Sequence, residues 1–148
     1  REVEYAKGYL TIQKMRYKDK LEFEIDVEPS ILNIPLIKLV LQPIIENAIY
    51  HGLKYKESKG LLQVKGFMKD GNAVLQVIDN GVGMDEETLS HIYDKHKVNY
   101  HSNGVGVYNV QKRLKLYYGE NYGITYESEK GVGTTATITI PGIQEESI

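Results

Sequence analysis

The sequence predicts an α/β two-layer sandwich, in which a mixed five-stranded sheet carries about three helices on one face. Two observations lead to this fold class. Five short segments alternate apolar and polar residues as half-buried strands do. Consecutive strands are joined in hairpins, and the longer segments before and between them have apolar residues at helical spacing. The repeated strand–helix–strand order of a Rossmann domain is therefore absent.

The expected strands are bounded by turn residues. Between the second and third lies "KDGN", in which Asp70 and Gly71 accept the positive φ angles of a tight hairpin turn. The last strand follows the glycine-rich "GVGTT". The five strands are predicted over 21–27, 61–68, 73–79, 123–128 and 134–141.

Four stretches have helical character. "NIPLIKLVLQPIIENAIYHG" is apolar on most sides and is typical of a buried helix. "DEETLSHIYD" places acidic residues in its first turn, where they suit the helix dipole, and an amphipathic segment ends on Gly119 as a C-cap would. Helices are thus predicted over 1–17, 33–52, 85–94 and 105–119.

Composition excludes several classes of protein. The chain has 148 residues, a net charge of −2 and no cysteine, so it suits one domain without disulfides, thiolate catalysis or cysteine-held zinc. That charge gives no field to attract nucleic acid, and no apolar run approaches the ~20 residues of a membrane span. Because the first helical pattern lacks a start cap, we expect residues 1–19 to be the end of a helix that enters from a missing segment. We expect residues 20–142 to form the domain and residues 143–148 to be a solvated tail.

The buried helix carries a polar stripe. Pro43, Asn47 and His51 stand at i, i+4 and i+8, with Glu46 and Tyr50 beside them. Proline removes a backbone donor and bends or starts a helix. A polar group on so apolar a helix must be hydrogen-bonded or face a ligand, since leaving it unpaired costs about 1–3 kcal/mol. Neighbouring backbone could equally satisfy Asn47 and His51.

The tripeptide GVG occurs three times, beginning at Gly81, Gly104 and Gly131, with uneven spacing and unrelated flanks. The first follows Asp79 at the end of a strand, where a carboxylate can accept a hydrogen bond from an exocyclic amine. The second opens a helix, a natural phosphate seat, and follows a long polar loop that resembles a lid. The third leads into the last strand at Thr134. Singly, each could be an ordinary turn.

Together, and in this order, these motifs resemble the ATP-binding fold shared by sensor histidine kinases, gyrase-type topoisomerases, Hsp90 and MutL, the GHKL or Bergerat superfamily. "LQPIIENAIYHGLK", "GVGVYNVQKRLKLYYGE" and "YLTIQKMRYKDKLEFEIDV" are similar to LytS/YesM-type sensor histidine kinases of two-component signalling. The resemblance covers residues 1 to about 141.

For the buried helix, the resemblance implies a catalytic and metal-binding role. Asn47 would coordinate Mg²⁺ through its amide oxygen, a hard ligand of the kind this ion prefers. Glu46 would orient a metal-bound water or Asn47, and His51 would face the phosphates. Many relatives carry lysine in place of Tyr50, and Lys54 would substitute for that phosphate contact.

For the glycine motifs, the resemblance implies an adenine pocket and a lid. Asp79 would read the adenine, Gly81 and Gly83 would let the ring approach the backbone, and Thr134 would join this network through its hydroxyl or a water. Closure on the triphosphate would involve the second motif, whose residues are Gly104, Val105 and Gly106.

Transfer of the γ-phosphoryl group is favoured over hydrolysis, because hydrolysing members place a glutamate four residues before the metal asparagine and this chain has Pro43 there. The acceptor would be a histidine in an upstream dimerisation helix, absent from this chain. Further partners would be the parent's own dimerisation helices and a response regulator, with no nucleic acid, in a cytoplasmic domain of an integral membrane protein. The alternatives are an anti-sigma-type Ser/Thr kinase and a non-catalytic nucleotide-gated interaction module.

Overall fold

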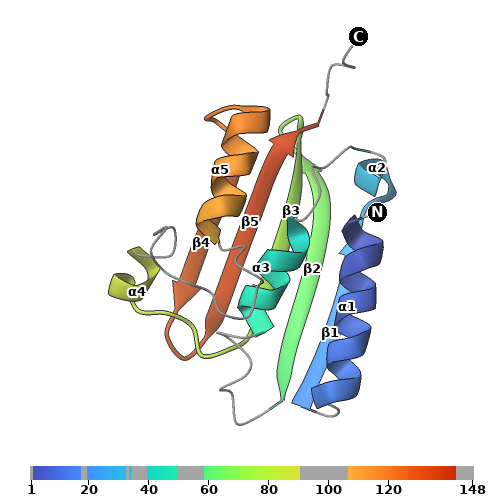
Figure 1. Ribbon diagram of the computed structural model, residues 1–148, viewed down its shortest axis with the longest axis vertical. Coiled ribbons are helices and arrows are strands. Elements are labelled where there is room, and N and C mark those ends of the chain that lie inside the picture. The colour runs from blue at the N-terminus through green and yellow to red at the C-terminus, as the bar shows by residue number, and fades with distance from the viewer. Residues whose placement is uncertain are drawn as a thin grey trace.

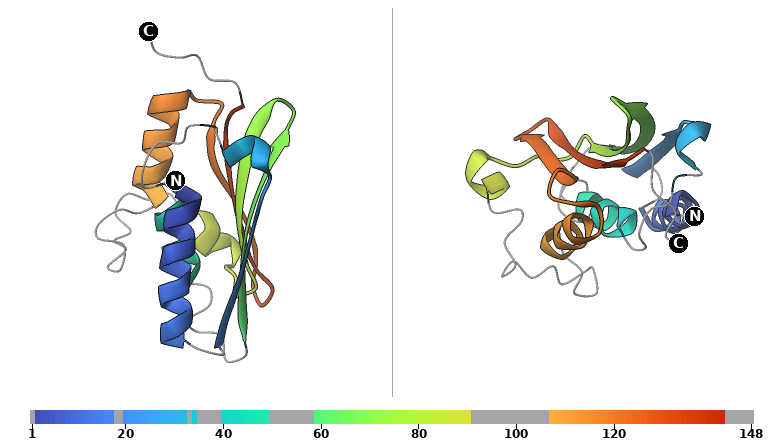
Figure 2. Two further views of the ribbon diagram at one scale, coloured as in Figure 1. Left: turned by 90° about the vertical axis from the view of Figure 1, so that its right-hand side faces the viewer. Right: turned by 90° about the horizontal axis from the view of Figure 1, so that it is seen from above.

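The computed structural model describes residues 2–17, 20–32, 34, 40–49, 59–90 and 107–142. A five-stranded sheet in the order β1-β2-β3-β5-β4 forms one layer, and the helices α1, α3 and α5 lie side by side on one of its faces (Figures 1 and 2). The predicted two-layer sandwich is therefore confirmed. The strands are β1 (Leu21–Val27), β2 (Gly60–Lys69), β3 (Asn72–Asp79), β4 (Gly123–Glu129) and β5 (Gly133–Pro141).

The sheet is mixed, as predicted. β1 runs parallel to β2, with Phe23 opposite Leu62, whereas the pairs β2–β3, β3–β5 and β4–β5 are antiparallel. The β2–β3 hairpin turns through Asp70 at φ 51° and Gly71 at φ 81°, the left-handed conformation that the sequence predicts for this turn.

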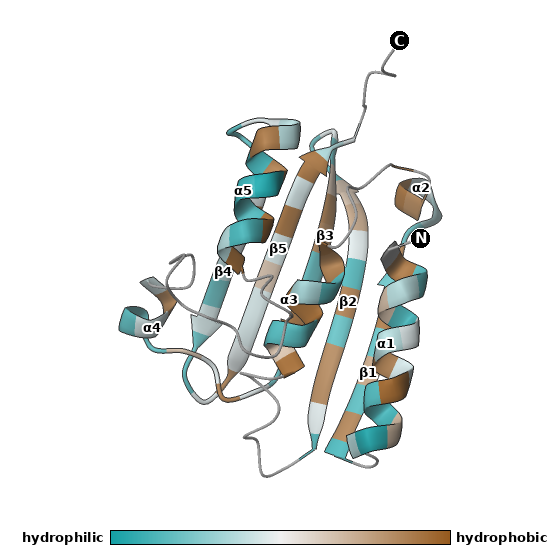
Figure 3. Cartoon of the chain, viewed as in Figure 1, coloured by the Kyte–Doolittle hydropathy of each residue, from teal (hydrophilic) through white to brown (hydrophobic). Residues whose placement is uncertain are grey.

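Alternation along the strands separates two faces, visible as brown and teal bands on β2 (Figure 3). Leu62 and Val64 of β2 are fully buried beneath the helices. The residues between them, such as Gln63, point to the opposite face, which none of the described helices covers and which we call the open face. The core lies between the sheet and the helices and includes Leu10, Ile44, Ile45, Val77, Leu114 and Ile138.

The helices are α1 (Glu2–Tyr17), α2 (Pro29–Leu32), α3 (Leu41–Asn47), α4 (Glu86–Ser90) and α5 (Val107–Tyr118). α2 is a short turn after β1 that the sequence pattern does not predict. α4 begins where the Asp85 carboxylate accepts the backbone N–H of Thr88 at 2.7 Å. This capping bond lowers the pKa of Asp85, as expected when the charged form accepts a hydrogen bond.

The prediction of one helix over 33–52 is wrong at its start. Ile34 and Val40 lie in bends, and α3 begins at Leu41. Proline is tolerated in the first turn of a helix, where its missing N–H has no intrahelical partner. Pro43 therefore stands in the first turn of α3, and Ala48 and Ile49 extend the helix by a π-helical turn. Residues 50–52 lie outside the described part of the chain.

α5 is fastened to the edge strand β4 by one side chain. The amide of Gln111 donates to the carbonyl of Ile124 at 3.0 Å and accepts the N–H of the same residue at 2.7 Å. A side chain here takes the place of a neighbouring strand. It is a contact that the helical period of 105–119 does not reveal.

Replacing Gln111 with alanine is therefore expected to lower the free energy of unfolding by about 1–3 kcal/mol, because the backbone N–H and carbonyl of the buried Ile124 lose their hydrogen bonds to the Gln111 amide. Urea unfolding followed by circular dichroism would measure the loss. Lys112→Ala, one residue along on the exposed side of α5, is the matched control and should change stability by less than about 0.5 kcal/mol. Equal stabilities for the two variants would contradict this role.

Candidate functional site

Asp79 ends β3 with a buried carboxylate. It is 5% exposed and is the only charged residue among the described ones that is buried. Its Oδ1 accepts the N–H of Gly81 at 2.8 Å, and a backbone hydrogen bond from Thr134 also stabilises the charged form. No ion pair joins Asp79 to any residue that the structure describes. A buried acid held only by backbone donors is costly, and such groups gather at functional sites.

Burial raises the pKa of Asp79 from 3.8 to about 6, because the cost of desolvating the charge exceeds the effect of the two backbone N–H groups. The carboxylate therefore remains mostly ionised at neutral pH. Its charged form keeps acceptor capacity beyond the hydrogen bonds described. It can accept a hydrogen bond from a ligand donor such as an exocyclic amine.

Two of the three GVG motifs meet in space. The N–H of Gly131 donates to the carbonyl of Val82 at 2.7 Å. Gly83 has a φ of +70°, and a Cβ there would clash with the carbonyl of Glu129. The loop after β3 and the β4–β5 turn thus cross backbone to backbone. Close approach of two chain segments is a purpose that glycine serves, so these glycines have a structural reason besides any contact with a ligand.

Ser128 connects the two crossing segments through hydrogen bonds. Its hydroxyl accepts the N–H of Met84 at 2.8 Å, lies 2.7 Å from the hydroxyl of Thr134 and is 3.1 Å from the carbonyl of Gly133. The sequence reasoning missed Ser128. Because Asp79 stands opposite Thr134 in the β3–β5 register, Ser128 positions the strand entry that holds the acid. No local sequence pattern indicates this role, because it depends on the β4–β5 register that places Ser128 opposite Thr134.

The predicted metal ligand lies at the end of α3, which sits between α1 and α5 over the middle of the sheet (Figures 1 and 2). Asn47 is half-buried, and none of the residues that the structure describes makes a hydrogen bond to its side chain. The reading in which neighbouring backbone satisfies this amide therefore gains no support. An amide oxygen that has no partner among the described residues fits the chemistry of Mg²⁺, which takes few protein ligands and keeps several waters.

Glu46 lies on the side of α3 nearer α1. It accepts the amide of Gln42 at 3.0 Å. Burial, followed by the charge of Glu46 and the neighbouring Tyr17, raises the pKa of the Tyr9 phenol to about 12. Glu46 thus belongs to the α1–α3 contact as well as adjoining Asn47. The other predicted site residues lie outside the described ranges, namely His51, Lys54, Gly104, Val105 and Gly106.

Comparison with known families decides between the possible readings of this site. The family model of the histidine kinase-, DNA gyrase B- and HSP90-like ATPases matches residues 33–144. This chain belongs to that ATPase family. The family assignment makes ATP the ligand of this domain, with Asp79 and Asn47 inside the matched region.

Relatives of this ATPase domain include a sensor histidine kinase and a sensor protein. The sensor histidine kinase YesM of Bacillus subtilis is 32% identical over 95% of the chain and 23% of its own length. The sensor protein LytS of Oceanobacillus iheyensis is 34% identical over 82% of the chain and 21% of its own length. The domain therefore spans about a quarter or less of these two relatives.

Solved structures share the fold. The catalytic domain of the histidine kinase ThkA superposes with a TM-score of 0.69 at 14% identity, over 93% of this chain and 90% of that one. ThkA in complex with the response regulator protein TrrA gives a TM-score of 0.65 at 18% identity, over 94% of this chain and 39% of that one. Within the described residues, no helix is long and apolar enough to span a bilayer.

Proposed function

We propose that this ATPase-family domain is the catalytic domain of a two-component sensor histidine kinase, and that it transfers the γ-phosphoryl group of ATP to a histidine on an upstream helix. The observation that carries the proposal is the buried, uncompensated carboxylate of Asp79, in a chain 32% identical to a sensor histidine kinase over 95% of its length.

In this mechanism the chain binds ATP, orients it and excludes water from the site. Asp79 accepts a hydrogen bond from the adenine amine, on a backbone fixed by the crossed turns, and Thr134 joins it through its hydroxyl. Asn47 would hold Mg²⁺, with Glu46 beside it, and the ion would supply positive charge to offset the charge of the phosphates. The triphosphate would be contacted by His51, Lys54, Gly104, Val105 and Gly106. Phosphoryl transfer needs mainly such positioning and charge stabilisation.

Transfer rather than hydrolysis is favoured by the residue one turn before Asn47. A glutamate there would serve as a base for water, but this chain has Pro43, which is buried in the first turn of α3. Pro43 has neither a titratable group nor a backbone N–H. We infer that the phosphoryl acceptor comes from outside the site, on a helix of the parent protein.

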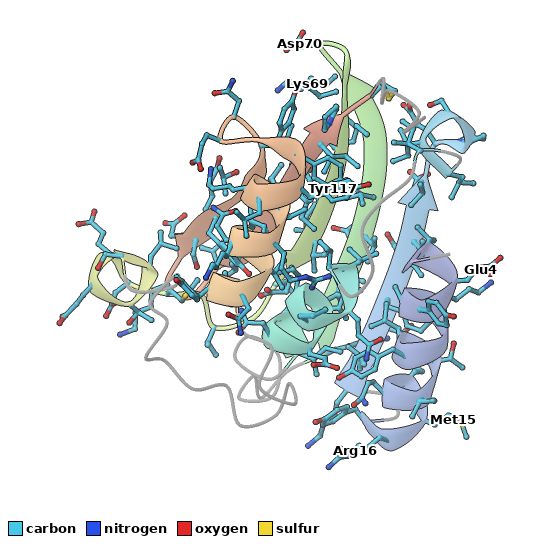
Figure 4. The ribbon with its side chains drawn as sticks, turned by 45° about the horizontal axis from the view of Figure 1, so that its top comes forward. Glu4, Met15, Arg16, Lys69, Asp70 and Tyr117 are labelled. Carbon is cyan, nitrogen blue, oxygen red and sulfur yellow. The ribbon has the colours of Figure 1, made fainter. Side chains whose placement is uncertain are left out.

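The outer side of α1 supports an attachment of this kind. Ala6 and Leu10 face the core, yet Tyr5, Ile12 and Met15 are 62%, 63% and 73% exposed, and Met15 points away from the rest of the molecule (Figure 4). A helix with apolar residues on two sides is ordinarily covered on both. We propose that the parent's dimerisation helices cover this side, that residues 1–19 connect to them, and that 20–142 form the domain.

The remaining partners follow from the proposed function. We propose a cognate response regulator as the next phosphoryl acceptor, a cytoplasmic location for the domain and a membrane-anchored parent. The anti-sigma-type kinase remains the second candidate because it uses the same fold on a hydroxyl acceptor. A non-catalytic nucleotide-gated module is disfavoured by the intact Asp79 and Asn47.

Metal-dependent ATP binding tests the site. Asn47→Ala is expected to abolish the Mg²⁺-dependent part of ATP affinity, because the ion loses its amide ligand, and to weaken binding about tenfold or more. Isothermal titration with Mg²⁺ and with EDTA would separate the two parts. Asn121→Ala, the same chemical change at an exposed turn before β4, is the control. Unchanged ATP affinity in both Asn47→Ala and Asp79→Asn would remove the proposal.

The acceptor chemistry distinguishes the two kinases. Labelled ATP is expected to phosphorylate a separately supplied dimerisation segment of the parent at histidine, giving phosphate that is lost in acid. Phosphate that survives acid would favour the Ser/Thr kinase. The fragment alone should incorporate little label, and rapid acid-labile labelling of it would place the acceptor among His51, His91, His96 and His101.

A further inference from the structure

The open face of the sheet contains a hollow of about 460 Å³ at the end where β3 stops. It crosses four strands and lies on the opposite side of the sheet from α3 and α5, as the alternation of β2 shows. The hollow is therefore separate from the covered face where Asn47 and the Asp79 carboxylate lie. Its lining side chains from the open face include Leu61, Gln63, Ile78, Glu127, Glu129 and Thr135.

The floor and the wall of the hollow differ in chemistry. Leu61 and Ile78 contribute apolar surface from β2 and β3, and Val132 stands at the β4–β5 turn with 61% of its surface exposed. Glu127 and Glu129 stand on β4, both exposed. Neither forms an ion pair with any residue in the described ranges. An apolar floor below two unneutralised carboxylates complements a long cationic side chain, whose stem is apolar and whose head is charged.

The nearest cation in sequence is not paired with these carboxylates. Lys130 follows Glu129 in the turn, but within the described residues it forms an ion pair with neither glutamate. The negative wall also excludes partners that present phosphates, such as nucleic acids and anionic membranes, because like charges repel. The sign and shape of the hollow thus favour a basic protein segment.

The spacing of the two glutamates sets the pattern of such a segment. Residues two apart on a strand point the same way and are separated by about 6.6–6.8 Å. An extended partner chain carrying arginine at alternate positions has the same spacing. Arginine also offers a planar fork of donors that matches a carboxylate.

We propose that this hollow is a docking site for a separate protein partner that presents two arginines at alternate positions of an extended segment. The arginine heads pair with Glu127 and Glu129 on β4, and the stems lie over Thr135 of β5 and Ile78 of β3, the two strands next to β4 in the sheet. The site stands on the opposite side of the sheet from the nucleotide, and the observations that place it there do not depend on the proposed kinase activity.

Docking is also expected to affect the Asp79 site. Asp79, Asn80, Gly133 and Thr134 are among the residues that line the hollow, and the same segments supply the N–H groups that hold the Asp79 carboxylate. A partner seated there would add contacts to the crossed turns that hold this carboxylate. ATP should then bind more tightly, and the coupling is reciprocal.

The docking site is tested with the 148-residue chain and acetyl-Ala-Arg-Ala-Arg-Ala-amide, followed by chemical shifts of backbone amides. We expect shifts clustered at Leu61, Gln63, Ile78 and Thr135, and no shifts with the peptide in which citrulline replaces both arginines. Glu127→Gln with Glu129→Gln should weaken binding roughly tenfold, as loss of two exposed ion pairs predicts.

The matched control removes two charges from the other edge of the same face. Asp26→Asn at the end of β1 with Glu28→Gln just after it, both exposed and outside the hollow, should leave peptide affinity unchanged. An equal loss in both double variants, or shifts scattered over the acidic surface, would overturn the docking site. The chain alone could also sediment as a dimer, with the double variant Glu127→Gln and Glu129→Gln sedimenting as a monomer. In that case the occupant is a second copy of this chain and the proposal fails.

The coupling has its own measurement and rests on the proposed function. ATP affinity is expected to rise about fivefold when the peptide saturates the chain. Clustered shifts without a change in ATP affinity would overturn the coupling alone. Absence of ATP binding with the peptide shifts intact would overturn the proposed function and leave the docking site standing.

Discussion

Replacing Asp79 with asparagine is expected to make the nucleotide-free protein more stable at pH 7 while weakening ATP binding about ten- to a hundredfold. The loss of affinity follows from replacing a charged acceptor with a neutral one at the adenine. The gain in stability follows from burial, because the folded protein bears the cost of an ionised carboxylate with no cation beside it. Function and stability oppose each other at this residue.

The size of the gain follows from the pKa. A rise from 3.8 to about 6 corresponds to about 3 kcal/mol of lost stability once the group is ionised. Asparagine keeps an oxygen that can accept from Gly81 or Thr134 but cannot satisfy both as well as a carboxylate. We therefore expect the free energy of unfolding at pH 7 to rise by about 1–3 kcal/mol.

The pH dependence has a definite sign. Because the folded protein holds the proton of Asp79 more tightly than the unfolded chain does, the stabilising contribution of protonated Asp79 is complete below about pH 3.8 and is lost as pH rises through about 6. The advantage of Asp79→Asn should therefore be full above pH 6 and shrink as pH falls toward 4. The same protonation should weaken ATP binding by the wild type, but not by Asp79→Asn, below pH 6.

Urea unfolding and ATP titration between pH 5 and pH 7.5 would measure both effects. Asp26→Asn makes the same chemical change at an exposed position of β1 and should alter neither stability nor ATP affinity. A variant at Asp79 that is less stable than the wild type at pH 7 would show that the carboxylate is stabilised in the folded protein. That result would remove the opposition between function and stability.

The strands could be predicted from the sequence because each has a core side and an open side. The alternation of Leu21, Phe23 and Ile25 with glutamates and an aspartate places β1 at its observed bounds, and the other four strands differ from their predicted bounds by a residue or so at either end. The helix over 33–52 was less predictable. The spacing of apolar residues does not show where a helix begins. The beginning of α3 depends instead on the backbone constraint of Pro43.

Asp79 could be placed from the sequence, since a strand end followed by a glycine turn is a local signal. What holds it is not local. Ser128 and the crossing of Val82 with Gly131 join segments about 45–50 residues apart, and nothing in either flank announces the contact. The sequence therefore indicates the chemical group, whereas the geometry that keeps it buried comes from β5 pairing with β3.

Replacing Gly133 with alanine is expected to be one of the two most destabilising glycine substitutions in the described chain, the other being Gly83→Ala. Gly133 has a φ of +145°, and a Cβ there would clash with the carbonyl of Asp79 and the Cα of Asn80. Both are backbone atoms of the neighbouring strand, so no side chain can rotate away to relieve the clash. The cost should exceed about 3 kcal/mol, a large part of the 5–15 kcal/mol that stabilises a typical domain.

Two other glycines separate the possible causes. Gly131→Ala meets open space at a φ of +86°, so it isolates the strain of a left-handed backbone and should cost about 1–2 kcal/mol. Gly8→Ala, in α1 with open space around it, should stabilise the protein by up to about 1 kcal/mol through helix propensity. Urea unfolding would rank the three variants.

The ATP affinity of these variants links the fold to the site. Gly133→Ala pushes β5 away from β3 at the residue before Thr134, whose backbone helps to hold the Asp79 carboxylate. Its folded fraction should bind ATP more weakly than the wild type, whereas Gly8→Ala should bind ATP normally. If Gly133→Ala were as stable as Gly131→Ala, the backbone of β5 would be able to shift away from β3 at Asp79 without a large cost in stability. The buried acid would then be held by the Gly81 turn alone.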